Sequence, residues 1–259
     1  MKISCVTASY VADLLGYPGQ VDWERASDLI AQAPLLDTID GMLQRLEPAR
    51  LDGIEFWFPH IFPGKLTPVL AGEILERLSA RTMVCNACAG GVPNPESDPY
   101  GAAAVFQTTR LMEAPLIAGH FDPRAIVALG RSCAKYGVYA AFENGGEKDV
   151  AEIEAAIAGG NQWIGANIDT GNLAAQGGDP VKAIRILGKR ILHVHLKDVS
   201  AEGAHDCVEI GKGIVDLNGV MRELKACGYD GWLSIEIETV DHDPTDEIIA
   251  SAETVRKFL

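Results

Sequence analysis

Long apolar runs are missing from this sequence of 259 residues. No window approaches the roughly 18 uncharged apolar residues that a membrane-spanning helix requires. The first ten residues, MKISCVTASY, run directly into a β-like segment and lack the charged region, apolar stretch and cleavage site of a secretory signal. The sequence therefore predicts a cytoplasmic protein with no membrane partner.

Basic residues are also scarce. The chain has 22 Lys and Arg against 36 Asp and Glu, which gives a formal net charge of -14. Nucleic-acid binding requires clustered cations that neutralise phosphates, so this balance argues against a nucleic-acid partner. An uncharged small molecule is the more natural ligand.

Cysteine is too sparse and scattered for a disulfide framework, and a chain of this size needs none for stability. Of the six cysteines, Cys85 and Cys88 form a CxxC pair. A structural zinc site needs a second such pair, which the sequence lacks. We interpret the two as small apolar residues in or near a buried strand.

What the sequence does contain is a regular alternation of strand-like and helical segments. Hydrophobic residues make up 47% of the chain and charged residues 22%, as in globular proteins with a large core. The eight strand-like segments are 3–9, 53–58, 82–88, 115–120, 138–144, 163–169, 191–197 and 232–238. Strands separated by helices run parallel, and eight of them close into a barrel. No GxGxxG follows the first strand, which disfavours an open doubly wound sheet. The sequence predicts an α/β fold, a (β/α)8 TIM barrel formed by one domain over 1–259.

One strand has an unusual composition. The segment 191–198 reads ILHVHLKD, and side chains alternate along a strand, so His193, His195 and Lys197 share one face. Buried parallel strands are normally continuous apolar runs. Two imidazoles and a cation on one face indicate that this face looks into a metal site rather than ordinary core.

Polar residues end the last four strands. In parallel barrels the chemistry lies at the C-terminal strand ends. Taken alone, each of the four residues at these strand ends has an ordinary explanation: a charge at the barrel rim, a helix cap, a core histidine or one partner of a salt bridge. Together they are harder to explain, because buried carboxylates at adjacent strand ends repel each other without a cation. The mixed oxygen and nitrogen set suits a divalent Mn²⁺, Co²⁺ or Mg²⁺ ion. The set is Glu143, Asp169, His195 and Glu236.

Several segments together resemble the xylose-isomerase-like TIM barrel family of sugar isomerases and epimerases. They are AFENGG (141–146), NIDTGN (167–172), HVHLKD (193–198), GKGIVD (211–216) and GYDGWLSIEIE (228–238), with GIEFWFP (53–59) in the first half. The resemblance implies that the four strand-end residues are the metal ligands. In ketose 3-epimerase members the two glutamates, here Glu143 and Glu236, also move the proton, one on each face of the substrate. Glu238 shares a face with Glu236 and is the second choice as a ligand, with a supporting role expected.

The implied activity is that of a divalent-metal-dependent isomerase or epimerase, with Mn²⁺ preferred. Its substrate would be a sugar or a polyol ketone, and its proton transfer would pass through a metal-stabilised enediolate. A dehydratase similar to the inosose dehydratases is the main alternative. An abasic-site endonuclease and a non-catalytic sugar-binding barrel are weaker alternatives. Members of the family commonly pair, so a homodimer or higher homo-oligomer is expected.

The chain also departs from the family pattern. Asn172 stands where many members have a histidine that touches substrate or a second metal, and the segment 199–211 contains no arginine to bind sugar hydroxyls. These departures bear on the choice of substrate and leave the four ligand positions intact.

Five residues are expected to contact substrate, and two, His193 and Glu238, to support the site. Four of the contacts could meet hydroxyls and one could stack on a sugar face. The contact residues are Asn172, Lys197, Glu55, His120 and Trp57, the last being the stacking residue. His193, one layer deeper than His195, is expected to support the ligands. His205, Asp206 and Cys207 resemble a ligand cluster, but we interpret them as a solvated loop.

Overall fold

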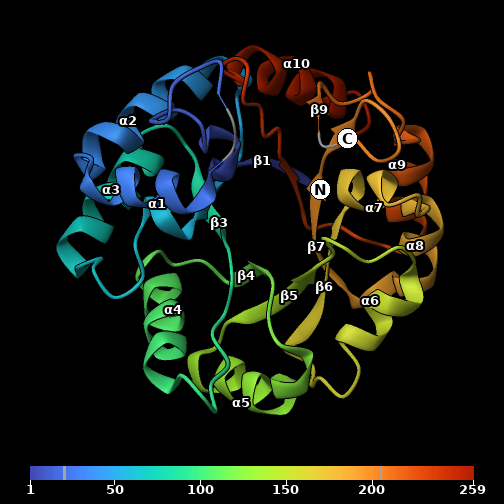
Figure 1. Cartoon of the computed structure of the whole chain (residues 1–259), viewed down its shortest axis with the longest axis horizontal. Helices are drawn as coiled ribbons and strands as arrows, with labels where there is room; N and C mark the ends of the chain where they lie inside the picture. The colour runs from blue at the N-terminus through green and yellow to red at the C-terminus, as the bar shows by residue number, and fades with distance from the viewer. Residues whose placement is uncertain (20–21, 205) are drawn as a thin grey trace.

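The computed structural model describes residues 1–19, 22–204 and 206–259, and His205 lies outside the described residues. Parallel strands form a closed barrel in the order β1-β10-β7-β6-β5-β4-β3-β2 (Figure 1). The barrel strands are β1 (Lys2–Val6), β2 (Gly53–Trp57), β3 (Val84–Ala89), β4 (Leu116–Gly119), β5 (Tyr139–Glu143), β6 (Ile164–Asp169), β7 (Ile191–Leu196) and β10 (Trp232–Ile235). The predicted (β/α)8 TIM barrel is confirmed.

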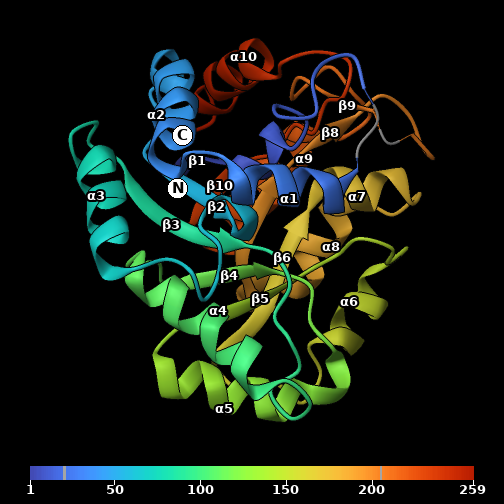
Figure 2. The same ribbon diagram turned by 60° about the vertical axis from the view of Figure 1, so that its left-hand side comes forward.

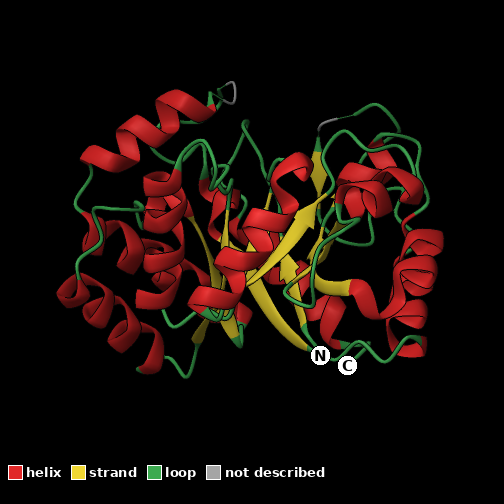
Figure 3. Cartoon of the chain, turned by 90° about the horizontal axis from the view of Figure 1, so that it is seen from below, coloured by secondary structure: helices red, strands yellow, loops and turns green. Residues whose placement is uncertain are grey.

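Helices surround this barrel on the outside, as the side view in Figure 3 shows. Aspartate or threonine caps begin many of them, and a proline often follows in the first turn, where its missing N–H costs nothing. The helices are α1 (Trp23–Gln32), α2 (Leu35–Leu46), α3 (Pro68–Ser79), α4 (Pro99–Leu111), α5 (Ile126–Tyr136), α6 (Val150–Ala156), α7 (Thr170–Ala175), α8 (Pro180–Leu187), α9 (Leu217–Ala226) and α10 (Thr245–Arg256). None of the helices in the described part of the chain is long and apolar enough to cross a membrane.

Strand ends differ from the predicted limits where side chains take over the hydrogen bonding. The first strand stops at Val6 and passes into a short 3-10 helix. The last stops at Ile235, because the Ser9 hydroxyl, at 3.0 Å, accepts the N–H of Ile237 in place of a neighbouring strand. Helix α7 and a small hairpin, β8 (Asp198–Val199) with β9 (Cys207–Val208), are too short to show a hydrophobic period in the sequence.

The barrel interior holds apolar and polar side chains. One cluster of small and medium apolar side chains consists of Ala87, Leu116, Ala118 and Ala141. Buried polar side chains also lie inside the barrel, including Glu55, His193 and Ser234. These polar side chains lie directly beneath the C-terminal strand ends, where the candidate site is found.

Acid should destabilise the fold through His60. This residue ends the short 3-10 helix (Phe58–His60) after β2, is 2% exposed, and has Nδ1 3.1 Å from the Thr7 hydroxyl. Burial lowers the pKa of His60 from 6.5 to about 3. The unfolded chain therefore binds this proton more strongly, and the stability present above about pH 6.5 is lost as the pH falls toward 3. Between about pH 7.5 and about pH 5 this loss amounts to about 2 kcal/mol.

We expect His60→Asn to lose about 2 kcal/mol less than the unmodified chain over this pH interval, because it has no imidazole to protonate. Urea unfolding at both pH values measures the difference. His242→Asn is the matched control, since that imidazole is half exposed and bonded to Asp241 and Glu247. If the His60→Asn and unmodified chains lose equal stability, the assignment to His60 is wrong.

Candidate functional site

Four side chains converge at the C-terminal end of the barrel. Glu143 ends β5, Asp169 ends β6, His195 lies in β7 and Glu236 follows β10. One nitrogen or oxygen atom from each lies within 4.8 Å of the others. Register explains the convergence, because Asp169 is level with His195, and His195 is level with Ser234, two residues before Glu236. The structure brings together the four residues that the sequence proposes as ligands.

Two buried atoms in this cluster have no hydrogen-bond partner among the described residues: His195 Nδ1 and Asp169 Oδ2. The imidazole Nδ1 lies 3.3 Å from a carboxylate oxygen of Glu143 and 3.3 Å from one of Glu236. Buried polar atoms left unpaired are costly and rare in folded proteins. One nitrogen and several carboxylate oxygens directed at a common point fit a divalent cation such as Mn²⁺, Co²⁺ or Zn²⁺.

Beneath the cluster, Glu55 holds the imidazole of His195. One Glu55 oxygen lies 3.1 Å from His195 Nε2; the other lies 2.7 Å from His193 Nε2 and 2.5 Å from the Ser234 hydroxyl that donates to it. Burial raises the pKa of Glu55, but the two imidazoles outweigh burial, so the pKa is lowered and the carboxylate stays ionised. A carboxylate on Nε2 turns Nδ1 toward the cluster, which is the usual support for a metal-binding histidine.

This position corrects one prediction. Glu55 was expected to contact substrate hydroxyls, yet it is fully buried under His195 and does not line the cavity above. The alternation of the strand indicates an inward side chain but not its depth in the barrel. His193 contacts Glu55 and not the four-residue cluster, which is compatible with the supporting role predicted for it.

Lys197 lies one layer above His195 with its ammonium among carboxylates. Its Nζ lies 2.7 Å from an oxygen of Glu238, 3.5 Å from one of Glu236 and 3.6 Å from one of Asp169. Burial lowers the pKa of Lys197, but these three carboxylates raise it well above the usual value. Lys197 is therefore a fixed cation at the site, and Glu238 pairs with it instead of joining the four-residue cluster.

The cluster still carries an excess of carboxylates. Burial raises the pKa of Asp169 to about 8, with Glu236 and Glu143 adding to the effect and Lys197 opposing it. For Glu236 burial also raises the pKa, but Lys197 and His195 outweigh it and lower the value to about 2. Burial and the acidic neighbours thus favour the protonated form of Asp169, as expected where a further cation belongs.

A cavity of about 260 Å³ opens above the cluster. Several predicted contact residues line it, namely Trp57, His120, Asn172 and Lys197, together with Glu143, His195, Glu236 and Glu238. The sequence reasoning missed Trp23, whose ring centre lies 5.3 Å from that of Trp57 in an edge-on arrangement. Trp23 opens α1, far from any strand end, so the search along strand ends had no reason to select it.

Two buried asparagines position the ligands and were also missed. Asn144 bonds the backbone of Asp169 twice, accepting its N–H at 3.0 Å and donating to its carbonyl at 2.9 Å. Asn167 accepts the His195 N–H at 3.0 Å. Asp169 itself uses one oxygen to cap α7 by accepting the Asn172 N–H at 2.8 Å. The cap and the cluster therefore use different oxygens of the same carboxylate, so the two interpretations of Asp169 are compatible.

Residues 123–258 match the family described as the xylose isomerase-like TIM barrel, and this match covers more than half of the chain. The chain belongs to the xylose isomerase-like TIM barrel family. Three curated relatives match shorter segments. MocC, a rhizopine catabolism protein of Rhizobium meliloti, is 31% identical over 44% of this chain and 41% of its own length. An inosose dehydratase of Geobacillus thermodenitrificans is 35% identical over 27% of this chain and 29% of its own.

The third relative, L-ribulose-5-phosphate 3-epimerase UlaE of Shigella flexneri, is 33% identical over 37% of this chain and 34% of its own length. The chain thus matches less than half of the length of each of these relatives. They are a catabolic protein, a dehydratase and an epimerase, and this range fits several related reactions rather than one.

Several solved structures with the same fold superpose over nearly the whole chain. The probable 3-DHS dehydratase AsbF of Bacillus anthracis has a TM-score of 0.73 at 16% identity, with 99% of both chains covered. An L-ribulose 3-epimerase has a TM-score of 0.71 at 17% identity, covering 100% of this chain and 94% of its own. The IolI protein with a bound zinc atom has a TM-score of 0.70 at 16% identity, covering 100% and 98%. At these identities the likeness shows the fold alone.

Metal binding should respond unequally to loss of the two histidines. His195→Ala removes the only nitrogen that the four-residue cluster offers, so we expect Mn²⁺ binding to be lost. His193→Ala removes a partner of Glu55 and should weaken binding by about tenfold to a hundredfold, as losses behind the ligands usually do. Titration with Mn²⁺, with the free ion measured by electron paramagnetic resonance, gives both affinities. Equal effects of the two substitutions would contradict this layering.

Proposed function

We propose that this protein is a divalent-metal-dependent isomerase or epimerase acting on a sugar or a related polyol ketone, with Mn²⁺ as the preferred ion. The arrangement of Glu143 and Glu236 carries the proposal. Both line the cavity, and each has an oxygen 3.3 Å from His195 Nδ1. Two carboxylates on either side of one point can reach opposite faces of a substrate held between them.

The bound ion would supply Lewis acidity, holding two substrate oxygens and stabilising the negative charge that develops when a carbon-bound proton leaves. Glu236 has a pKa of about 2 because Lys197 and His195 outweigh its burial, so it is ionised at neutral pH and able to accept a proton. Glu143 faces it across the cluster and would hold or return the proton on the other face. Both carboxylates remain close to the reacting carbon, as proton transfer requires.

The walls of the cavity suit a small polyhydroxylated molecule. Trp23 and Trp57 offer aromatic surface for the carbon-bound hydrogens of a sugar ring. Asn172 and His120 offer polar groups for hydroxyls, and His120 Nδ1 lies 3.9 Å from Glu143 Oε2. Lys197, not an arginine, supplies the positive charge of the pocket. These features support a compact substrate whose hydroxyls bind to amide, imidazole and ammonium groups.

A dehydratase is the second candidate, and Lys197 is the observation that favours it. Its ammonium stays protonated because three carboxylates raise its pKa. In dehydration, a glutamate takes the proton next to the carbonyl, the electron pair forms a carbon–carbon double bond, and the β-hydroxyl leaves as water. The proton taken from carbon completes the leaving water, and the Lys197 ammonium would stabilise the departing hydroxyl by hydrogen bonding. The inosose dehydratase relative supports the same reading.

Exchange with solvent should depend on the two glutamates. With Mn²⁺ and a panel of ketoses, aldoses and inososes in D₂O, we expect deuterium to enter one carbon of a substrate. Glu143→Gln and Glu236→Gln should each slow exchange by about 10²- to 10⁴-fold, because the amide cannot take the proton. Glu154→Gln, a surface glutamate paired with Arg190, is the matched control and should leave the rate unchanged. Tight substrate binding without any exchange would contradict catalysis and favour a binding protein.

Lys197→Met should separate the two candidate reactions. If the protein is a dehydratase, the product is lighter than the substrate by one water, and the variant keeps solvent exchange while losing water release. If it is an isomerase or epimerase, the product has the substrate's mass, and the variant mainly loses substrate affinity. Mass spectrometry of the products together with the exchange rate distinguishes these outcomes.

A further inference from the structure

A second cavity, of about 660 Å³, lies at the opposite end of the barrel from the metal cluster. It is bounded by α3, β3 and the segment after α4, and the view in Figure 2 places these elements together on one flank. Residues at the N-terminal ends of strands line it, including Val84 of β3 and Trp232 of β10. Among the described residues, it shares no lining residue with the cavity above the cluster.

The cavity exists because the barrel wall is incomplete there. Strands β3 and β4 pair only at two positions, Cys88 with Ile117 and Ala89 with Ala118. Pro115, just before β4, lines the cavity and has no N–H to extend the ladder. On the other side of β3 the register to β2 shifts at Asn86, which is skipped between Cys85 and Ala87. The chain around Asn86 is therefore a bulge beside an opening.

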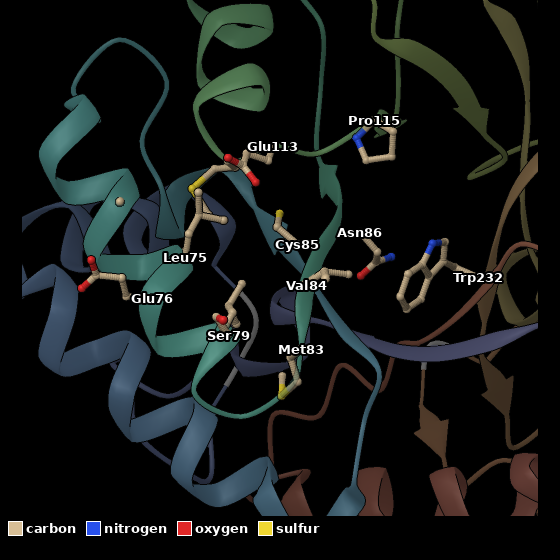
Figure 4. A pocket seen from close by; sticks show the side chains of 13 residues that line it. Leu75, Glu76, Ser79, Met83, Val84, Cys85, Asn86, Glu113, Pro115 and Trp232 are labelled. Atoms are coloured by element: carbon tan, nitrogen blue, oxygen red, sulfur yellow. The ribbon is translucent and has the colours of Figure 1, made fainter.

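Asn86 is the polar group of this cavity. Its side chain is 2% exposed, and neither its Oδ1 nor its Nδ2 has a hydrogen-bond partner in the described part of the chain. Figure 4 shows the amide directed toward the Trp232 indole. A buried amide with both ends unpaired is costly, so a ligand that completes it gains affinity. The amide presents a donor and an acceptor side by side, and its complement is an adjacent acceptor and donor, as in a lactam or carboxamide.

Most of the other lining residues are apolar or aromatic, and Glu76, Ser79 and Glu113 are the polar ones. Leu75, Met83 and Met112 form walls that can adapt to a ligand, since methionine side chains are flexible. The Trp232 ring packs against Gly53, where an added Cβ would lie 2.9 Å from the indole. Exposed carboxylates of Glu76 and Glu113 stand at the edge and disfavour an anion. The chemistry that fits is a flat, uncharged, largely apolar ring system.

We propose that this cavity is a binding site for a small uncharged heteroaromatic molecule that carries a lactam or carboxamide group. The amide-like group pairs with Asn86, and the ring lies against Trp232 and the apolar wall. The volume is within the range of small-molecule sites. The site is independent of the metal cluster and of the proposed reaction.

A pair of probes tests the amide pairing. 2-Quinolinone carries a ring lactam, whereas N-methyl-2-quinolinone keeps the ring and the carbonyl but lacks the N–H donor. Isothermal titration should show that the unmodified chain binds 2-quinolinone at least about tenfold more tightly than the methylated probe, the cost of leaving a buried acceptor unpaired. Asn86→Leu should lower the affinity for 2-quinolinone by about tenfold and remove the difference between the probes.

A second variant keeps the test decisive if Asn86→Leu does not fold. Gly72 of α3 lines the cavity, and an added Cβ there meets no atom within 4 Å, so Gly72→Leu can fill the space without a clash. It should abolish binding of both probes. Gly41→Leu in α2 is the matched control, equally open but away from the cavity, and should bind as the unmodified chain does. The proposal is overturned by absence of 2-quinolinone binding, by equal affinity for the two probes, or by retention of binding in Gly72→Leu.

Discussion

The hydrogen bond between Glu55 and His195 is the contact on which the site depends. The carboxylate holds Nε2 from below, so Nδ1 is presented to the strand-end carboxylates above. Glu55 is itself held by His193 and Ser234, and Ser234 in turn lies 2.6 Å from the hydroxyl of Ser4 in the neighbouring β1. This chain of buried contacts crosses the barrel floor and orients one imidazole. These buried polar side chains thus orient His195 so that its Nδ1 points toward the cluster at the C-terminal strand ends.

Above that layer, negative charge is concentrated beyond what the chain's own cations neutralise. Lys197 contacts Asp169, Glu236 and Glu238, yet the pKa of Asp169 still rises to about 8 because burial and its acidic neighbours outweigh the lysine. Such an arrangement is unfavourable on its own and becomes favourable with a divalent cation. Lys197 is also the cation that lines the cavity of a chain whose segment 199–211 lacks the arginine expected of ketose epimerases. Its ammonium is suited to a departing hydroxyl as well as to a bound one, so the residue also bears on which reaction the site performs.

The sequence predicts the fold well because alternating strands and helices have one simple closed arrangement. The four-residue cluster is also predictable, since parallel strands bring their C-terminal ends to one edge. The depth of a side chain along the barrel axis cannot be predicted in the same way. Glu55 and Glu143 both point inward, but Glu55 is buried beneath His195 and Glu143 lines the cavity. This difference depends on how far neighbouring strands are shifted relative to one another. Trp23 reaches the cavity from a helix after β1, and Asn144 acts through backbone contacts across strands; neither leaves a pattern in the sequence.

The bulge at Asn86 lies between the lower cavity and the residues that support the metal cluster. Ala87, the next residue, is level with Glu55 in the β2–β3 ladder, so the irregularity that opens the lower cavity lies beside the carboxylate that holds His195. A regular β3 would carry Asn86 in the ladder with β2. In the structure β3 and β4 pair at two positions, and the contacts of Glu55 with His193, His195 and Ser234 are still formed. Strands β2 and β3 therefore border both of these cavities: Trp57 and Ala89 line the upper one, Val84 and the free amide of Asn86 line the lower one, and Glu55 is buried beneath the upper one.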